Sequence, residues 1–213
     1  MLDPAIAGML TGLSLIVAIG AQNAYVLRQG LLRSHIGPVV AICAVSDLVL
    51  IGAGVSGIGT LVDQAGWVLD TVRWLGVAFL TWYAVGSLRS AALRPEALDA
   101  RAAAAPGAAA APGAAESRAI VLGKTVALTW LNPHVYLDTV LLLGSIAAAH
   151  DGGGGGRWWF ALGAGCASIA WFTSLGFGAR LLAPLLARPA AWRLLDVVIA
   201  ATMLLVAARL ALG

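Results

Sequence analysis

Long apolar runs dominate this chain and alternate with short polar segments. Each run holds about the 20 mostly apolar residues that a helix needs to cross a bilayer. The runs cover residues 5–27, 36–61, 67–88, 125–149, 158–186 and 192–212. We therefore predict an all-α integral membrane protein with six transmembrane helices. A five-span form with a cytoplasmic N-terminus stays open as an alternative.

The third and fourth runs are separated by a segment rich in Ala, Pro and Gly. Such a composition cannot bury a core, so we predict a flexible linker there. The predicted organisation is a first three-helix repeat at 1–90, the linker at 91–118 and a second three-helix repeat at 119–213. An odd number of helices per repeat makes the second repeat enter the membrane from the opposite face. This predicts a 3+3 inverted-topology repeat, the plan of many secondary transporters.

The composition fits a bilayer better than water. Hydrophobic residues make up 61% of the chain and charged residues 11%, whereas soluble domains carry about 25% charged residues. The net charge of +3 comes from basic residues scattered through the connections, which does not resemble a nucleic-acid-binding stripe. We expect lipid as the surroundings, no nucleic-acid partner and no cofactor or metal.

Basic residues are distributed unequally between the two membrane faces of a six-helix arrangement. One face holds Arg28, Arg33, Arg89, Arg94, Arg101, Arg118, Lys124, Arg180, Arg188 and Arg193, and the other holds Arg73, Arg157 and Arg209. Cytoplasmic loops carry the excess of Lys and Arg. We therefore predict a multi-pass protein of the bacterial inner membrane with both termini outside and the linker in the cytoplasm.

Two acidic residues lie near the middle of apolar runs. Asp47 interrupts the second run and Asp138 the fourth, and we expect no basic residue at comparable depth in any span. An ionisable group at bilayer depth costs at least ~2.5–3.5 kcal/mol on insertion scales, so it needs a partner or a purpose. We predict that the two acids bind a cationic group, a proton, or both in exchange. The alternative is two protonated acids hydrogen-bonded inside the bundle.

Polar breaks interrupt the first and fourth runs at corresponding positions. Gly20 and Pro133 are the predicted helix-breaking residues, since glycine lets the backbone deviate and proline removes a backbone donor. Gln22, Asn23 and Asn132 beside them offer donors and acceptors to a ligand. Broken helices at matching positions indicate a binding site near the membrane midplane. A simple proline kink with an Asn plug is the alternative.

Other polar and aromatic residues near these breaks receive weaker predictions. Ser46, next to Asp47, is a candidate ligand of the same site. His134 lies four residues before Asp138, so it is a candidate proton relay, although a structural hydrogen bond is its more ordinary role. Trp130 and Trp171 lie deeper than interfacial tryptophans, and we expect core or lipid packing for them.

These same segments resemble the LysE/ArgO-type family of basic amino-acid exporters. The resembling text is GAQNAYVLRQG at 20–30, His35, ICAVSDL at 42–48 and TWLNPHVYLDT at 129–139. The first block is the more specific one, because related neutral amino-acid exporters usually carry a Pro-Gly-Pro-type motif there. The resemblance implies an efflux permease for L-lysine or L-arginine, driven by the membrane potential or a proton gradient. It also implies that Asp47 and Asp138 are the acids of the family's motifs.

Several alternatives remain at the level of the sequence. A carrier for another small solute, such as a neutral amino acid or a divalent metal, is the first, although a metal would want more ligands than two Asp and two separated Cys. A transmembrane thiol-electron carrier using Cys43 and Cys166 is the second, because these residues occupy matching positions in the two halves. A membrane enzyme is the third, but no activating motif surrounds a Ser. Stripes of small residues indicate close helix packing, within one protomer or in a homodimer.

Overall fold

The computed structural model describes residues 2–17, 20–33, 35–57, 66–102, 117–151, 155–181 and 189–212. Regular structure in these ranges is helical, without a strand. The helices are α1 (Leu2–Ile16), α2 (Ala21–Leu32), α3 (Ile36–Val55), α5 (Gly66–Ala102), α6 (Arg118–Trp130), α7 (Pro133–Val135), the π-helix η1 (Tyr136–Leu142), α8 (Leu143–Ala149), α9 (Gly156–Gly178) and α10 (Pro189–Leu212). The all-helical prediction is confirmed.

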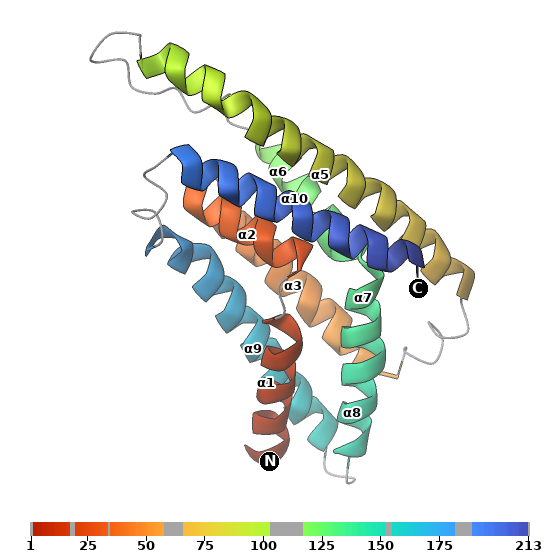
Figure 1. The fold of residues 1–213 in the computed structure, drawn as a ribbon. Coiled ribbons are helices and arrows are strands. Elements are labelled where there is room, and N and C mark those ends of the chain that lie inside the picture. Colours follow the sequence, from red (N-terminus) through yellow and green to blue (C-terminus); the bar gives the residue numbers. More distant parts are fainter. Residues whose placement is uncertain are drawn as a thin grey trace.

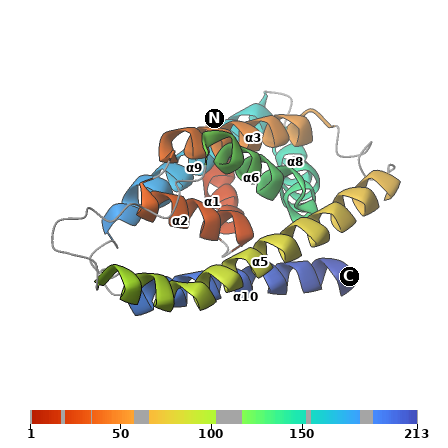
Figure 2. The ribbon, with the colours of Figure 1, turned by 90° about the horizontal axis from the view of Figure 1, so that it is seen from above.

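The helices form two groups that pack against each other. Helices α5 and α10 run side by side, and α1 packs along α9 (Figure 1). Figure 2 shows the helices from above. In that view α5 and α10 form one layer at the bottom of the picture, and the remaining helices form a second layer next to it. The main hydrophobic core lies where the layers meet and includes Tyr25, Leu80, Tyr83, Leu128 and Met203. The core therefore joins helices from both halves of the sequence.

Several of these helices are able to cross a membrane by length and composition. Three stretches qualify alone, Ile36–Val55, Gly156–Leu181 and Arg193–Leu212, and the total rises to five if the bent pairs α1–α2 and α6–α8 each count as one span. Helix α5 contains the predicted third span and is 37 residues long, but it is not among the five. Its status as a span stays a prediction.

The predicted linker begins as helix. Helix α5 continues to Ala102, past the predicted linker start at residue 91, while residues 103–116 lie outside the described part of the chain. Residues 91–102 are rich in Ala, Leu, Glu and Arg, which are strong helix formers, and the helix continues through them despite Pro95, a residue that disfavours a helix interior. Residues 152–154 of the predicted glycine-rich loop also lie outside the described residues.

Small residues bring α1 into backbone contact with α9. A Cβ atom added at Gly8 would lie 2.0 Å from the Phe160 carbonyl oxygen, and one added at Gly163 would lie 1.9 Å from the Ala5 carbonyl oxygen. No larger side chain fits without separating the helices. The expected close packing is therefore present, and it fixes the first segment of the broken helix pair α1–α2 against α9.

Candidate functional site

The chain bends sharply at both predicted breaks. Helices α1 and α2 meet at 83°, and α6 meets the segment from Pro133 to Ala149 at 56°. Gly20 precedes α2 in an extended conformation. Pro133 begins α7, and the side-chain oxygen of Asn132 accepts the backbone N–H of His134 at 3.2 Å. Both helix starts therefore lie where Gly20 and Pro133 were predicted to break the run.

Each break leaves helix-end carbonyls without a helical donor, and each half satisfies one of them in the same way. Asn23 donates its side-chain N–H to the Ile16 carbonyl at the end of α1, at 2.7 Å. Tyr136 donates its hydroxyl to the Trp130 carbonyl at the end of α6, at 2.9 Å. In both halves a side chain from just beyond the break ties the two helix segments together.

A cavity of about 320 Å³ lies between the two breaks. Its size is at the lower end for small-molecule sites, which span roughly 300–1,000 Å³. The predicted site residues that line it are Gly20, Gln22, Asn23, Asp47, Asn132, His134 and Asp138. Residues predicted from distant parts of the sequence, in both halves, therefore share one cavity. Ser46 and Pro133 are not among its lining residues.

Asp47 is the most buried acid of the cavity lining. Its side chain lies on α3, is 6% exposed and accepts a hydrogen bond from the Ser168 hydroxyl of α9 at 2.7 Å. Among the described residues it forms no ion pair. Ser46 points elsewhere, because adjacent helical positions face different directions, and it accepts the indole N–H of Trp130 at 3.1 Å.

Asp138 lies on the opposite break and is half-buried. It belongs to the π-helix η1, a rare conformation that is frequent at functional sites. Gly54 of α3 packs directly on this segment, since an added Cβ would lie 2.8 Å from the Thr139 carbonyl oxygen. His134 is exposed and lines the same cavity. In the described ranges Asp138, like Asp47, makes no ion pair.

Arg209 corrects one expectation from the sequence. We expected no basic residue at the depth of the two acids, but Arg209 of α10 lines the cavity together with them. The expectation was wrong because it assigned Arg209 to the membrane face by its sequence position, whereas a long side chain extends well away from its backbone. The cavity therefore contains a positive group of the protein's own.

The amides and indoles around the cavity have specific partners that the sequence did not reveal. The indole N–H of Trp171 on α9 donates to the side-chain oxygen of Asn23 at 3.3 Å. Asn23 thus joins α1, α2 and α9, besides lining the cavity. The side-chain nitrogen of Gln22 is buried and has no oxygen acceptor among the described residues. Its neighbour is the thiol of Cys43, with which the Gln22 side chain interacts.

Sequence analysis also missed a third buried acid, Asp196 on α10. Its side chain is 0% exposed, lies 3.4 Å from Arg28 Nε of α2 and accepts the Ser90 hydroxyl of α5 at 3.3 Å. In the sequence, this residue could have been found as an acid four residues after Trp192, within the sixth apolar run. Asp196 is therefore a buried acid of a different kind, one that already has a cationic partner.

The two cysteines have unlike surroundings despite their matching sequence positions. Both are free thiols, with Cys43 buried and Cys166 exposed. Cys43 packs into the main core beside residues such as Val39 and Phe172. The matching positions on which the thiol-carrier alternative rested therefore do not give the two thiols matching surroundings.

Comparison with known proteins relates the whole chain to one family. A family model described as "LysE type translocator" matches residues 13–213. The chain is 40% identical to the lysine exporter LysE of Corynebacterium diphtheriae, with 97% of each chain covered. It is 38% identical to the arginine exporter protein ArgO of Salmonella schwarzengrund and 39% identical to that of Escherichia coli, each match covering 96% of this chain and 91% of the relative. No solved structure matches. The chain belongs to the LysE type translocator family.

Proposed function

We propose that this protein is a secondary active exporter of basic L-amino acids, lysine or arginine, in the bacterial inner membrane. Relatives about 40% identical over nearly the full chain are named lysine and arginine exporters. The observation that carries the proposal is a cavity lined by Asp47 and Asp138, neither of which has an ion-pair partner in the described ranges. The activity that we propose for this protein is transport and not an enzymatic reaction.

Charge determines which end of the substrate each part of the cavity binds. The substrate's ammonium or guanidinium group lies between Asp47 and Asp138, because an anionic group in an apolar setting needs a cation. The opposite end carries a carboxylate, which suits the N-terminus of α2, where backbone N–H groups and the helix dipole favour anions. Gln22 and Arg209 supply further donors for that carboxylate, and Asn132 orients the α-amino group.

Alternating access follows from a 3+3 inverted repeat of six spans. The repeat is supported by the matching breaks and by helix pairing between the halves, with α5 along α10 and α3 against α9. Rocking of one repeat against the other would expose the cavity to each side in turn. Asp138 and His134, four residues apart, form the proposed proton relay that couples export to a gradient.

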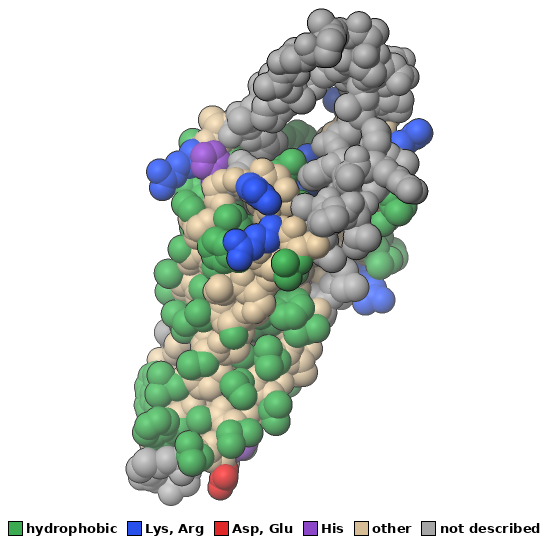
Figure 3. Space-filling model, turned by 90° about the vertical axis from the view of Figure 1, so that its left-hand side faces the viewer, with side chains coloured by type: hydrophobic (Ala, Val, Ile, Leu, Met, Phe, Trp, Pro, Cys, Tyr) green, Lys and Arg blue, Asp and Glu red, His purple; other side chains and the backbone are tan. Residues whose placement is uncertain are grey.

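The orientation has both termini outside. Figure 3 supports it, since the Lys and Arg side chains on the visible face lie in the upper half of the view, while the lower half shows hydrophobic side chains among other surface and one acidic side chain near the tip. In this orientation α2, the start of α6 and the second half of α5 lie on the cytoplasmic side. We include a homodimer in the proposal, because helix faces with small residues allow two protomers to pack closely.

The test is efflux of labelled arginine and lysine from a bacterial host that lacks its own exporters. We expect Asp47→Asn and Asp138→Asn each to lower efflux at least about 30-fold, because loss of a desolvated charge partner costs about 2 kcal/mol or more. Asp70→Asn is the matched control, since Asp70 on α5 is exposed, and it should transport normally at equal expression. Full efflux from both site variants, or none from the wild type, would contradict the proposal.

A further inference from the structure

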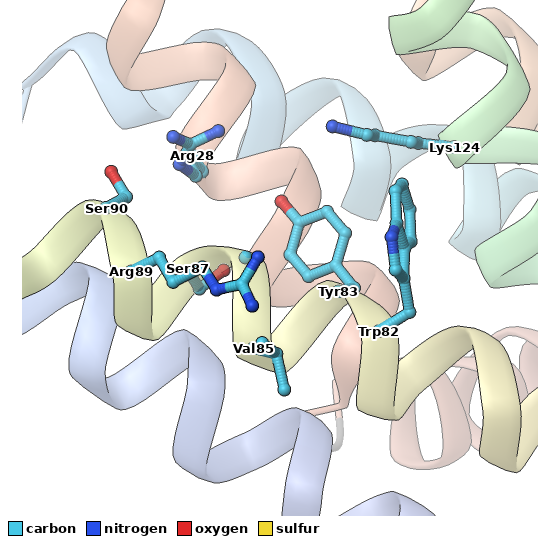
Figure 4. Close-up of a pocket in the computed structure, with 9 residues that line it drawn as sticks. Arg28, Trp82, Tyr83, Val85, Ser87, Arg89, Ser90 and Lys124 are labelled. Carbon is cyan, nitrogen blue, oxygen red and sulfur yellow. The ribbon is translucent and has the colours of Figure 1, made fainter.

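A second cavity, with the opposite charge, lies away from the proposed substrate site. It has a volume of about 280 Å³ and lies between α2, α5 and α6. Arg28, Arg89 and Lys124 line it, one from each helix, and Figure 4 draws their side chains around a common space. No Asp or Glu is among its lining residues in the described part of the chain. Three cations facing one space favour an anionic ligand.

Two of the cations are held in position by the fold. Arg28 Nε lies 3.4 Å from a carboxylate oxygen of the buried Asp196, as an ion pair without a hydrogen bond between these two atoms. Lys124 Nζ lies over the rings of Tyr83 and Trp82, with distances of 5.4 and 5.8 Å to the ring centroids. Such contacts reduce the freedom that a ligand would otherwise have to restrict. Two of the three cations are therefore positioned by the fold, while Arg89 is exposed.

Polar donors complete the lining. The hydroxyl groups of Ser87 and Ser90 lie on the same face of α5, three residues apart. Arginine, lysine and serine side chains together are the usual donors to a phosphate group, which offers several acceptor oxygens. A basic amino acid is the wrong ligand here, because its cationic group would face three like charges. The site is thus chemically distinct from the cavity with Asp47 and Asp138.

The outer side of the cavity is apolar and exposed. Trp82 is 61% exposed, and Val85 and Leu88 on the same helix are exposed as well. This face of α5 is apolar enough to contact lipid chains, while the cavity lies toward the basic end of the molecule. The inner leaflet carries anionic lipids, and basic pockets between helices on the cytoplasmic side bind their head groups. Cations next to an exposed apolar surface match an amphiphile better than a soluble anion.

We propose that this cavity binds the headgroup phosphate of an anionic phospholipid of the cytoplasmic leaflet. The phosphate contacts Arg28, Arg89 and Lys124, the Ser87 hydroxyl donates to one of its oxygens, and the acyl chains lie along Trp82, Val85 and Leu88. Because the ligand joins α2 of the first half to α6 of the second, its binding stabilises the contact between the two halves.

Thermal unfolding of the purified full-length protein in a neutral detergent tests this inference without measuring transport. Phosphatidylglycerol, phosphatidylcholine and inorganic phosphate are titrated separately, and the melting temperature gives an apparent affinity for each. We expect a saturable rise with phosphatidylglycerol alone. In Arg89→Gln/Lys124→Gln the affinity should fall about 25-fold, since each basic residue near an anionic lipid contributes about fivefold.

Two further variants keep the result interpretable. Arg89→Gln alone changes an exposed side chain and should fold normally while losing about fivefold in affinity. Arg180→Gln is the matched control, because Arg180 is exposed on the same basic end and does not line the cavity; it should bind like the wild type. An equal rise with phosphatidylcholine or with inorganic phosphate, or an equal loss in Arg180→Gln, would overturn the proposal.

Discussion

Asp47 and Asp196 are both buried carboxyls on apolar helices, yet their surroundings differ. Asp196 has Arg28 at 3.4 Å and the Ser90 hydroxyl as partners. Asp47 has the Ser168 hydroxyl and, among the described residues, no cation. Breaking a buried ion pair costs stability, whereas an acid without a cation has a place for one. Burial alone therefore does not separate the two acids; the presence of an internal cation beside Asp196 does.

The largest expected effect is a difference in unfolding free energy between the variants of the two acids. Asp196→Asn leaves Arg28 without its counter-charge, and because Arg28 is only 17% exposed we expect a loss of about 3 kcal/mol in unfolding free energy. Asp47→Asn removes a buried charge that has no cation, so stability should stay unchanged or rise. Urea or thermal unfolding in detergent measures both.

A double variant sharpens this comparison. Arg28→Gln/Asp196→Asn removes both charges and should be more stable than either single variant, since no uncompensated charge remains. If Asp47→Asn destabilised the protein as much as Asp196→Asn does, the two acids would be structural groups of the same kind.

An intermediate effect concerns Ser168, the hydroxyl partner of Asp47. Ser168→Ala removes a hydrogen bond to a charged group, which is worth about 1.5–3 kcal/mol. We expect the KM for arginine to rise about tenfold, because the carboxylate loses its orienting donor. Initial rates in proteoliposomes measure it, with Ser174→Ala as the control, since Ser174 is exposed on the same helix. An unchanged KM would mean that Asp47 needs no orientation from α9.

The smallest effect concerns Trp171, which holds Asn23 at the first break. Trp171→Phe keeps the aromatic volume and removes the indole donor, at a cost of about 1 kcal/mol. We expect about a fivefold decrease in kcat/KM for export with little change in expression. Trp158→Phe, an exposed position at the start of α9, is the control. A similar decrease in both variants would make the effect one of aromatic packing.

The sequence predicted well those features that depend only on a residue's position along a helix. Asp47 and Asp138 interrupt apolar runs, and Gly20 and Pro133 interrupt the helical backbone itself. Each leaves a local signal, an ionisable group or a helix breaker, that needs no knowledge of neighbouring helices. A cavity shared by the two halves follows because Asp47 and Asp138 each lie near the middle of an apolar run.

The features that the sequence did not reveal depend on rotation about the helix axis and on side-chain reach. Arg209 sits near a helix end but lines the cavity, and Ser46 sits beside Asp47 but faces Trp130. Cys43 and Cys166 match in register but not in burial. Such differences arise when helices pack, so hydropathy along one chain does not contain them.

The most direct test compares arginine with citrulline, its neutral analogue of nearly the same shape, in proteoliposome counterflow. We predict that arginine preloaded inside wild-type vesicles drives uptake of labelled arginine and that preloaded citrulline does not, because the cavity with Asp47 and Asp138 requires a cation. Asp47→Asn should reduce the response to arginine without affecting vesicle insertion. Equal exchange of arginine and citrulline by the wild type would contradict a site based on charge.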